Sequence, residues 1–247
     1  AMATGWVLDG GTWYYATGSG ALARGPVSVG GVPYCFDART GAMLTGYQTD
    51  AQGVRRYFGS CGPLNGWGLV DGSWYWFADG IASTGWLYTG GAWYWLDPAT
   101  HAMATGLHEC NGSAYWFDAS GAMATGWVLD GGTWYYATGS GALASGWAYV
   151  GGAWYWLDPA THAMATGLHE CNGSAYWFDA SGAMATGWVL DGGTWYYATG
   201  SGALASGWAY VGGAWYWLDP TTHAMTTGVQ EIDGVKYSFA SNGAWLG

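Results

Sequence analysis

Apolar and polar positions alternate along this chain in short segments, which are separated by glycine-rich turns. Residues 127–129 and 133–137 are two such segments, and the turn sequence Asp-Gly-Gly lies between them. Two short β-type segments around a turn that tolerates positive φ predict a hairpin. Because side chains alternate along a strand, Trp134 and Tyr136 should point to one side and Tyr135 to the other. Each unit is therefore expected to be a β-hairpin followed by a loop.

The hairpin pattern recurs with two superimposed periods. Units begin 19 to 21 residues apart, at Gly5, Gly25, Gly46, Gly66, Gly85, Gly106, Gly126, Gly146, Gly167, Gly187, Gly207 and Gly228. They form triplets, because nearly the same unit recurs every 60 or 61 residues, at Trp6, Trp67, Trp127 and Trp188. A lone hairpin is marginally stable in water, so neighbouring units must cover its aromatic faces. We therefore predict an all-β fold, a β-solenoid of about twelve stacked hairpin repeats of about 20 residues, with three hairpins per turn.

The three units of a triplet differ consistently, and both ends of the chain depart from the pattern. A first unit reads GWVLDGGTWYYATGSGALAS, a second GWAYVGGAWYWLDPATHAMAT and a third GLHECNGSAYWFDASGAMAT. We expect one repeat domain over residues 1–247. It should consist of a degenerate N-terminal triplet at 1–65, regular repeats at 66–227 and a C-terminal capping repeat at 228–247. Degenerate end repeats are typical caps of a solenoid. Because the chain begins within the repeat, it is expected to be a fragment of a longer protein.

Composition and charge narrow the function further. The chain has 51% hydrophobic and 9% charged residues, 21 tryptophans and a net charge of −11, with only five Lys and Arg. Nucleic-acid binding needs a basic footprint, so no nucleic-acid partner is expected. No apolar run is long enough for a membrane span, so no membrane insertion is expected. The acidic surface suits either solubility or a cationic ligand.

The chain shows no catalytic or metal-binding constellation. The carboxylates recur with the repeat and lie mainly in turns, which suits a structural role better than a single active site. His108, Glu109 and Cys110 are residue types that bind metals, but nothing nearby completes a tetrahedral metal site. We therefore expect no enzyme activity, no metal and no cofactor. Cys35 and Cys61 lie in adjacent units and could form a disulfide.

The repeat closely resembles a known family. Gly-Trp, a turn, Trp-Tyr-Tyr, Gly-x-Met or Gly-x-Leu and then Thr-Gly-Trp are similar to the choline-binding, or cell-wall-binding, repeats of Gram-positive surface proteins. The resemblance implies a left-handed solenoid in a secreted protein at the cell surface or cell wall. It also implies attachment to choline or phosphocholine of teichoic acids, held between consecutive hairpins by three aromatic residues and often a methionine. Related glucan-binding and clostridial toxin repeats bind carbohydrate.

The chemistry of the aromatic pattern supports a quaternary ammonium ligand independently. Such a group has a diffuse charge and no hydrogen-bond donor, so electron-rich ring faces are its best partners, each worth roughly 0.5–2 kcal/mol. A lectin or adhesin that binds glucan or a host glycan is the main alternative, and a structural stalk is a third. A sugar usually needs polar side chains among the rings, and the repeat offers few.

Carried over to this chain, each cage consists of the Gly-Trp indole, the first Trp of the Trp-Tyr-aromatic run and the last aromatic of the next run. The expected sites are Trp67, Trp74 and Trp95; Trp86, Trp93 and Trp116; Trp127, Trp134 and Trp156; Trp147, Trp154 and Trp177; and Trp188, Trp195 and Trp217. The adjacent tyrosine is the alternative third wall. A methionine in the connecting loop could close the cage or pack on its rings, at Met103, Met123, Met164 and Met184.

Two kinds of unit are expected to lack a working cage. Third units carry Leu and Ala in place of the two tryptophans, so at most two sites per triplet are expected. At the chain ends, the pair Trp6 and Trp13 is expected to face Cys35, and the pair Trp208 and Trp215 to face Ser238. These two terminal cages should therefore be weak or absent.

Overall fold

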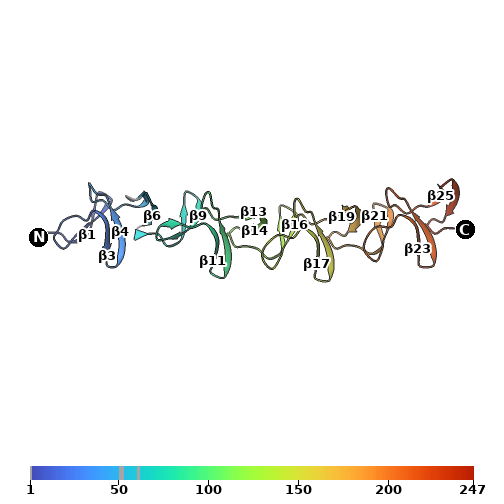
Figure 1. Cartoon of the computed structure of the whole chain (residues 1–247), viewed down its shortest axis with the longest axis horizontal. Coiled ribbons are helices and arrows are strands. Elements are labelled where there is room, and N and C mark those ends of the chain that lie inside the picture. Colours follow the sequence, from blue (N-terminus) through green and yellow to red (C-terminus); the bar gives the residue numbers. More distant parts are fainter. Residues whose placement is uncertain (1, 50–52, 60–61) are drawn as a thin grey trace. The chain divides into compact units, whose positions relative to one another are not determined.

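The fold is built from β-hairpins. The computed structural model describes residues 2–49, 53–59 and 62–247, and within these ranges it has 26 strands and no helix (Figure 1). In that part of the chain, therefore, no helix is long and apolar enough to cross a bilayer. Twelve separate sheets are formed by the described residues, ten of two strands and two of three. The prediction of an all-β chain of hairpin repeats is confirmed.

The chain divides into two compact units, Ala1–Ala124 and Thr125–Gly247. The first strand of each hairpin begins at the glycine that opens its repeat. The first unit contains β1 Gly5–Asp9, β2 Thr12–Ala16, β3 Gly25–Val29, β4 Val32–Phe36, β5 Gly46–Thr49, β6 Arg55–Gly59, β7 Gly62–Pro63, β8 Gly66–Val70, β9 Ser73–Ala78, β10 Ile81–Ala82, β11 Gly85–Thr89, β12 Ala92–Leu96, β13 Gly106–Cys110 and β14 Ser113–Phe117.

The second unit consists of six two-stranded hairpins within its described residues, whereas the first also contains the two three-stranded sheets. Its strands are β15 Gly126–Asp130, β16 Thr133–Ala137, β17 Gly146–Val150, β18 Ala153–Leu157, β19 Gly167–Cys171, β20 Ser174–Phe178, β21 Gly187–Asp191, β22 Thr194–Ala198, β23 Gly207–Val211, β24 Ala214–Leu218, β25 Gly228–Ile232 and β26 Val235–Phe239.

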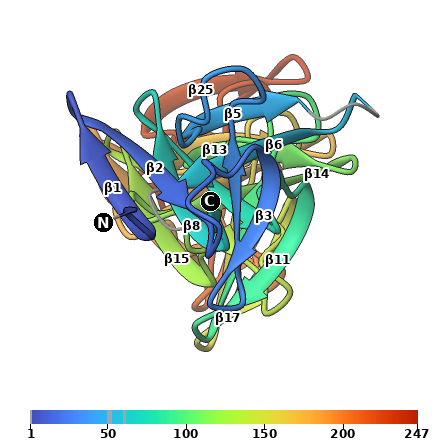
Figure 2. The same cartoon turned by 90° about the vertical axis from the view of Figure 1, so that its left-hand side faces the viewer.

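Within the first unit, successive hairpins point in different directions. In Figure 2, β1 lies at the left, β5 at the top, and β3 runs toward the bottom. β11 belongs to the third hairpin after β3 and again runs toward the bottom. This arrangement agrees with the predicted period of three hairpins per turn.

The strand register gives each hairpin two different aromatic faces. In the pair β17–β18, Trp147 lies opposite Trp156, and Tyr149 lies opposite Trp154. These four side chains share one face, because positions two apart on a strand point the same way. Tyr155, between the two tryptophans of β18, points to the other face. A hairpin therefore presents indoles on one side and a tyrosine on the other.

The core follows the residue of the second hairpin strand that pairs with the glycine opening the repeat. This residue is buried, with at most 8% of its surface exposed, at Ala16, Phe36, Phe58, Phe77, Leu96, Phe117, Ala137, Leu157, Phe178, Ala198, Leu218 and Phe239. Burying a large side chain of this kind contributes about 1.5–3 kcal/mol. A column of small contributions, one from each repeat, thus holds the hairpins of a unit together.

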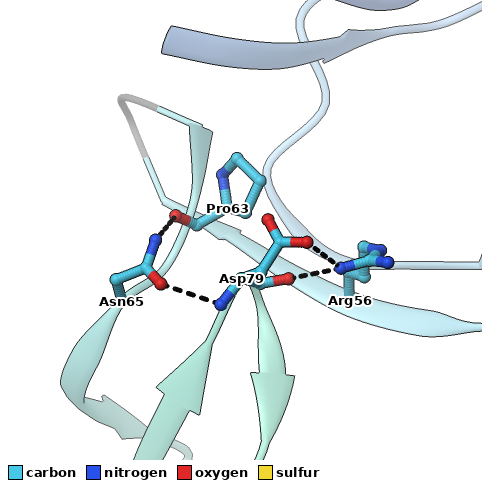
Figure 3. A network of polar contacts seen from close by, with 4 residues as sticks. All are labelled: Arg56, Pro63, Asn65 and Asp79. Atoms are coloured by element: carbon cyan, nitrogen blue, oxygen red, sulfur yellow. Dashed lines mark hydrogen bonds and ion pairs between the residues drawn. The ribbon is translucent and has the colours of Figure 1, made fainter.

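A network of polar contacts joins the degenerate N-terminal triplet to the hairpin that follows it (Figure 3). Arg56 Nη1 donates to the Asp79 carboxylate at 2.5 Å and to the Asp79 carbonyl at 2.7 Å. Asn65 accepts a hydrogen bond from the Asp79 backbone N–H at 2.8 Å and donates one to the Pro63 carbonyl at 3.2 Å. This network connects β6 with the strands that follow it.

Cys35, Cys110 and Cys171 have free thiols, whereas Cys61, proposed above as a partner of Cys35, lies outside the described residues. Cys110 and Cys171 are buried in the core. Burial raises the pKa of both thiols to about 11. A buried thiol then stays protonated where the unfolded chain ionises, so it destabilises the fold as the pH rises through the ordinary thiol pKa.

We therefore predict that Cys110 and Cys171 react slowly in the native protein. At pH 9, alkylation by iodoacetamide should be at least about tenfold slower than in urea, because only the thiolate reacts. Mass spectrometry of digested samples measures both sites together, because the two cysteines lie in identical sequence, and the urea-unfolded sample is the reference. Equal native and unfolded rates for these two thiols would contradict this interpretation.

Candidate functional site

Seven hairpins each present a pair of tryptophans on one face. In six of these pairs the ring centroids lie 6.2–6.4 Å apart with planes at 87–90°. The second indole of each pair keeps 40–45% of its surface exposed, at Trp13, Trp74, Trp93, Trp134, Trp154, Trp195 and Trp215. Large aromatic side chains are normally buried when they serve packing alone, so this repeated exposure indicates a surface with another role.

The tyrosine in the middle of the next run forms the third wall beside each pair. Its ring lies 4.7–5.0 Å from the first indole of the pair, in contacts between Trp6 and Tyr34, Trp67 and Tyr94, Trp86 and Tyr115, Trp127 and Tyr155, Trp147 and Tyr176, Trp188 and Tyr216, and Trp208 and Tyr237. Two rings from one hairpin and one from the next thus meet around a common space.

The loop after the second hairpin supplies the fourth wall and fixes it with a backbone bond. Its methionine N–H donates to the carbonyl of the second tryptophan at 2.7–2.8 Å, in Met43 with Trp13, Met103 with Trp74, Met123 with Trp93, Met164 with Trp134, Met184 with Trp154 and Met225 with Trp195. Trp245 takes this position against Trp215 at 2.8 Å. We call each set of two tryptophans, tyrosine and methionine or Trp245 an aromatic cage.

The cages of Trp67, Trp147 and Trp208 illustrate the space that the walls enclose. Trp67, Trp74, Tyr94 and Met103 line a pocket of about 270 Å³ with Ser120. A pocket of about 370 Å³ is lined by Trp147, Trp154, Tyr176, Met184, Gly200 and Ser201. A third, of about 330 Å³, is lined by Trp208, Trp215, Tyr237 and Trp245. The loop of the following repeat thus contributes small residues to the rim of two pockets.

The sequence assigned the third wall of each cage first to the last aromatic residue of the Trp-Tyr-aromatic run in the next hairpin. In the structure this residue does not line the pocket. Trp95 and Trp156 are buried in the core, with 4% and 5% exposure. Trp116 and Trp177 are half-buried, and each indole Nε1 is buried without a hydrogen-bond partner. Trp217 packs on the first indole of its own hairpin, with centroids 5.4 Å apart.

Strand alternation explains this correction. The last aromatic shares a face with the tryptophans of its own hairpin, so it cannot point back toward the preceding one. The middle tyrosine lies on the opposite face and does point back. The alternative third wall considered from the sequence, the adjacent tyrosine, is the one that the structure brings to the pocket.

The two terminal cages are also more complete than expected. Trp6 and Trp13 meet Tyr34, not Cys35, because Tyr34 is the middle residue of its run. For the same reason Trp208 and Trp215 meet Tyr237, not Ser238. The C-terminal cage has four aromatic walls, since Trp245 replaces methionine with its ring 5.9 Å from Trp208. Neither terminal cage lacks a wall.

Hairpins of the third kind present no indole pair. In the second unit, Leu168 and Ala175 stand at the two tryptophan positions. The loop residue that donates to the Ala175 carbonyl, at 2.8 Å, is Leu204 and not methionine. Within this unit, methionine or Trp245 therefore accompanies paired indoles, and leucine accompanies their absence.

A different pocket, of about 510 Å³, lies at the corresponding position of the degenerate triplet. Its lining includes Tyr47, Arg55, Asp71, Tyr75 and His101. Arg55 stands at the second tryptophan position, and its guanidinium lies 3.8 Å from the Tyr47 ring centroid. Here a side chain of the protein itself occupies the ring face. This contact was not predicted from the sequence.

Three loop histidines have a positive φ. His101, His162 and His223 have φ of 60–65°, and each Nδ1 lies 3.1 Å from a backbone carbonyl oxygen of the preceding repeat. Among the residues that the structure describes, no group of three His, Cys, Asp or Glu side chains could hold a metal ion.

The geometry defines a class of protein: a β-hairpin repeat module with aromatic pockets open to solvent. Comparisons with known proteins place it more closely. A choline-binding repeat family matches residues 104–146 and 165–207, and a cell wall binding repeat family matches residues 4–22, 84–98, 145–159 and 206–221. The chain belongs to this choline-binding, or cell-wall-binding, repeat family, as its likeness to solved members also shows.

Three solved structures that resemble the chain are of Streptococcus pneumoniae proteins. CbpJ is 29% identical over 99% of this chain and 100% of its own, with a TM-score of 0.69. Choline binding protein F, solved in the presence of a peptidoglycan analogue, is 31% identical over 99% and 93%, with a TM-score of 0.62. The choline-binding domain of CbpL is 28% identical over 74% and 98%, with a TM-score of 0.52. No curated protein sequence matches the chain.

We predict that Gly182 is needed for the shape of a cage. Gly182 has φ of 80°, and a methyl group there would overlap the side-chain end of Met164. Gly182→Ala should lower the free energy of unfolding by about 1–2 kcal/mol from the backbone alone. Gly139, which has open space and no positive φ, is the matched control, and Gly139→Ala should change stability by less than about 1 kcal/mol. Urea unfolding measures both, and equal effects would contradict the assignment.

Proposed function

We propose that the chain is a non-catalytic module that binds choline or a similar quaternary ammonium group in its aromatic cages and so holds a secreted protein at a bacterial cell wall. The observation that carries this proposal is the repeated exposure of the second indole, as in Trp154, at 45%. A purely structural stalk would gain more from burying that ring.

The chemistry of the cages suits such a ligand. Their walls are ring faces and a thioether, and the cage lining provides no carboxylate. A quaternary ammonium group needs no hydrogen-bond acceptor and is attracted to ring faces by about 0.5–2 kcal/mol each. The net charge of −11 also attracts cations at longer range. Membership of the family and the likeness to choline-binding proteins support the same ligand.

Repetition gives the module its retention on a polymer. Several weak sites on one chain raise the effective concentration of each further site once the first is occupied. Teichoic acids that carry phosphocholine are the proposed partner, because they display the group many times. Catalysis has no part in this proposal.

A wall or host glycan is the second candidate ligand, favoured by one observation. The pocket around Tyr47 combines rings with Arg55, Asp71 and Thr100, which is the mixture of polar and aromatic side chains that a sugar requires. The aromatic cages lack this mixture. Choline therefore remains the ligand proposed for the cages.

Calorimetric titration with choline chloride tests the proposal. The seven cages should give a stoichiometry of seven ligands per chain, and tetramethylammonium should compete for them. Sodium chloride and a glucan oligosaccharide serve as controls. Binding of the oligosaccharide without binding of choline would assign the cages to a glycan, and no binding of either would leave a structural stalk.

A pair of variants tests the third wall. Tyr176→Ala should remove one ring from the cage of Trp147 and Trp154 and weaken that site about 2- to 30-fold, so that six sites of unchanged affinity remain. Trp177→Phe changes the neighbouring ring, which lies outside the pocket lining, and should keep all seven. Loss of a site in Trp177→Phe but not in Tyr176→Ala would show that the wall is misassigned.

A further inference from the structure

The cages fall into two classes that differ at one flanking position. In the first hairpin of each triplet, the residue opposite the second indole is leucine, as in Leu129 opposite Trp134. In the second hairpin of each triplet from residue 66 onward it is tyrosine, as in Tyr149 opposite Trp154. The full sets are Leu8, Leu69, Leu129 and Leu190, and Tyr88, Tyr149 and Tyr210.

Each of these tyrosines forms a continuous surface with the cage tryptophan. The ring centroids of the pairs Tyr88–Trp93, Tyr149–Trp154 and Tyr210–Trp215 lie 5.1–5.2 Å apart, with planes at 48–51°. The tyrosines keep 59–61% of their surface exposed. We call each pair a Tyr–Trp platform. Its tryptophan also lines the cage, so a ligand in the cage would continue onto the platform.

Folding does not require a tyrosine at this position. The first hairpin of each triplet carries leucine there in the same register and forms the same cage. Tyr88 is kept although its neighbours Leu87 and Thr89 differ from Ala148 and Val150 of the later copy. Three exposed phenol rings, one in each triplet from residue 66 onward, therefore point to recognition rather than packing.

The size and charge of a platform select its partner. Two partly exposed rings offer a contact surface on the order of 200 Å² to a partner. A stable protein interface needs about 800 Å² from each partner, so one platform is too small for it. The acidic chain disfavours nucleotides. A single sugar ring fits, because its C–H face can stack on the rings while its hydroxyls reach the tyrosine hydroxyl or water.

We propose that each Tyr–Trp platform binds a pyranose ring of the polymer whose sugar carries the quaternary ammonium group. The cages beside a platform then recognise the sugar together with its charged substituent. This inference rests on the proposed function of the cages. Recurrence of the platform once per triplet suits a partner that is itself a repeating polymer. The cages flanked by leucine, in the first hairpin of each triplet, recognise the charged group alone.

Calorimetry with two probes, phosphocholine and methyl glucopyranoside carrying phosphocholine at O6, tests the inference. The wild-type chain should bind the glycoside about fivefold tighter than phosphocholine at three sites and equally at four. Replacing the three tyrosines together, Tyr88→Leu, Tyr149→Leu and Tyr210→Leu, should abolish the gain. Leucine occupies this position in the first hairpin of each triplet, so the fold and free-choline binding should be unchanged.

The reciprocal variant is the matched control. Leu129→Tyr with Leu190→Tyr should add two tighter sites. Equal affinity for both probes in the wild type, or a gain that survives the triple substitution, would overturn the platform while leaving the choline cages intact. Absence of binding to phosphocholine itself would overturn the proposed function and this inference together.

Discussion

Packing of aromatic rings between consecutive hairpins is the interaction on which this structure depends. A two-stranded hairpin has no interior, so its indoles can be covered only by the next hairpin and its loop. The first indole of each pair contacts the following tyrosine at 4.7–5.0 Å, and a backbone N–H of the loop beyond that tyrosine donates to the backbone carbonyl of the second tryptophan. The same contacts that join the repeats therefore build the pockets.

This dual use explains why the pockets are regular. The backbone bond to the carbonyl of the second tryptophan fixes the fourth wall relative to the first two, without depending on the side chain at that position. Trp245 can accordingly replace methionine at the C-terminal cage. The core column of Phe, Leu and Ala carries much of the stability, so the indole faces remain available to a ligand.

The hairpins and their period could be predicted from sequence, because glycine-rich turns and alternating residues report local backbone geometry directly. The pairing of walls was harder. Trp156 and Tyr155 are neighbours in sequence, and only the direction of the next hairpin decides which one faces Trp127. Strand alternation, applied to both hairpins at once, would have selected the tyrosine.

The choice of Cys35 instead of Tyr34 at the N-terminal cage followed from the same error and would have been corrected in the same way. The contact in the degenerate triplet, in contrast, had no sequence signal. The contact of Arg55 with Tyr47 depends on the degenerate hairpin β5–β6, which has no close copy in the chain. A contact that occurs once cannot be inferred from a repeat.

The most direct test of the central claim is a crystal structure of the chain grown with choline. The account predicts ligand density inside the cages, with the quaternary nitrogen between the ring faces of Trp147, Trp154 and Tyr176. Density confined to the surface outside the cages, or cages that stay empty at saturating choline, would contradict it.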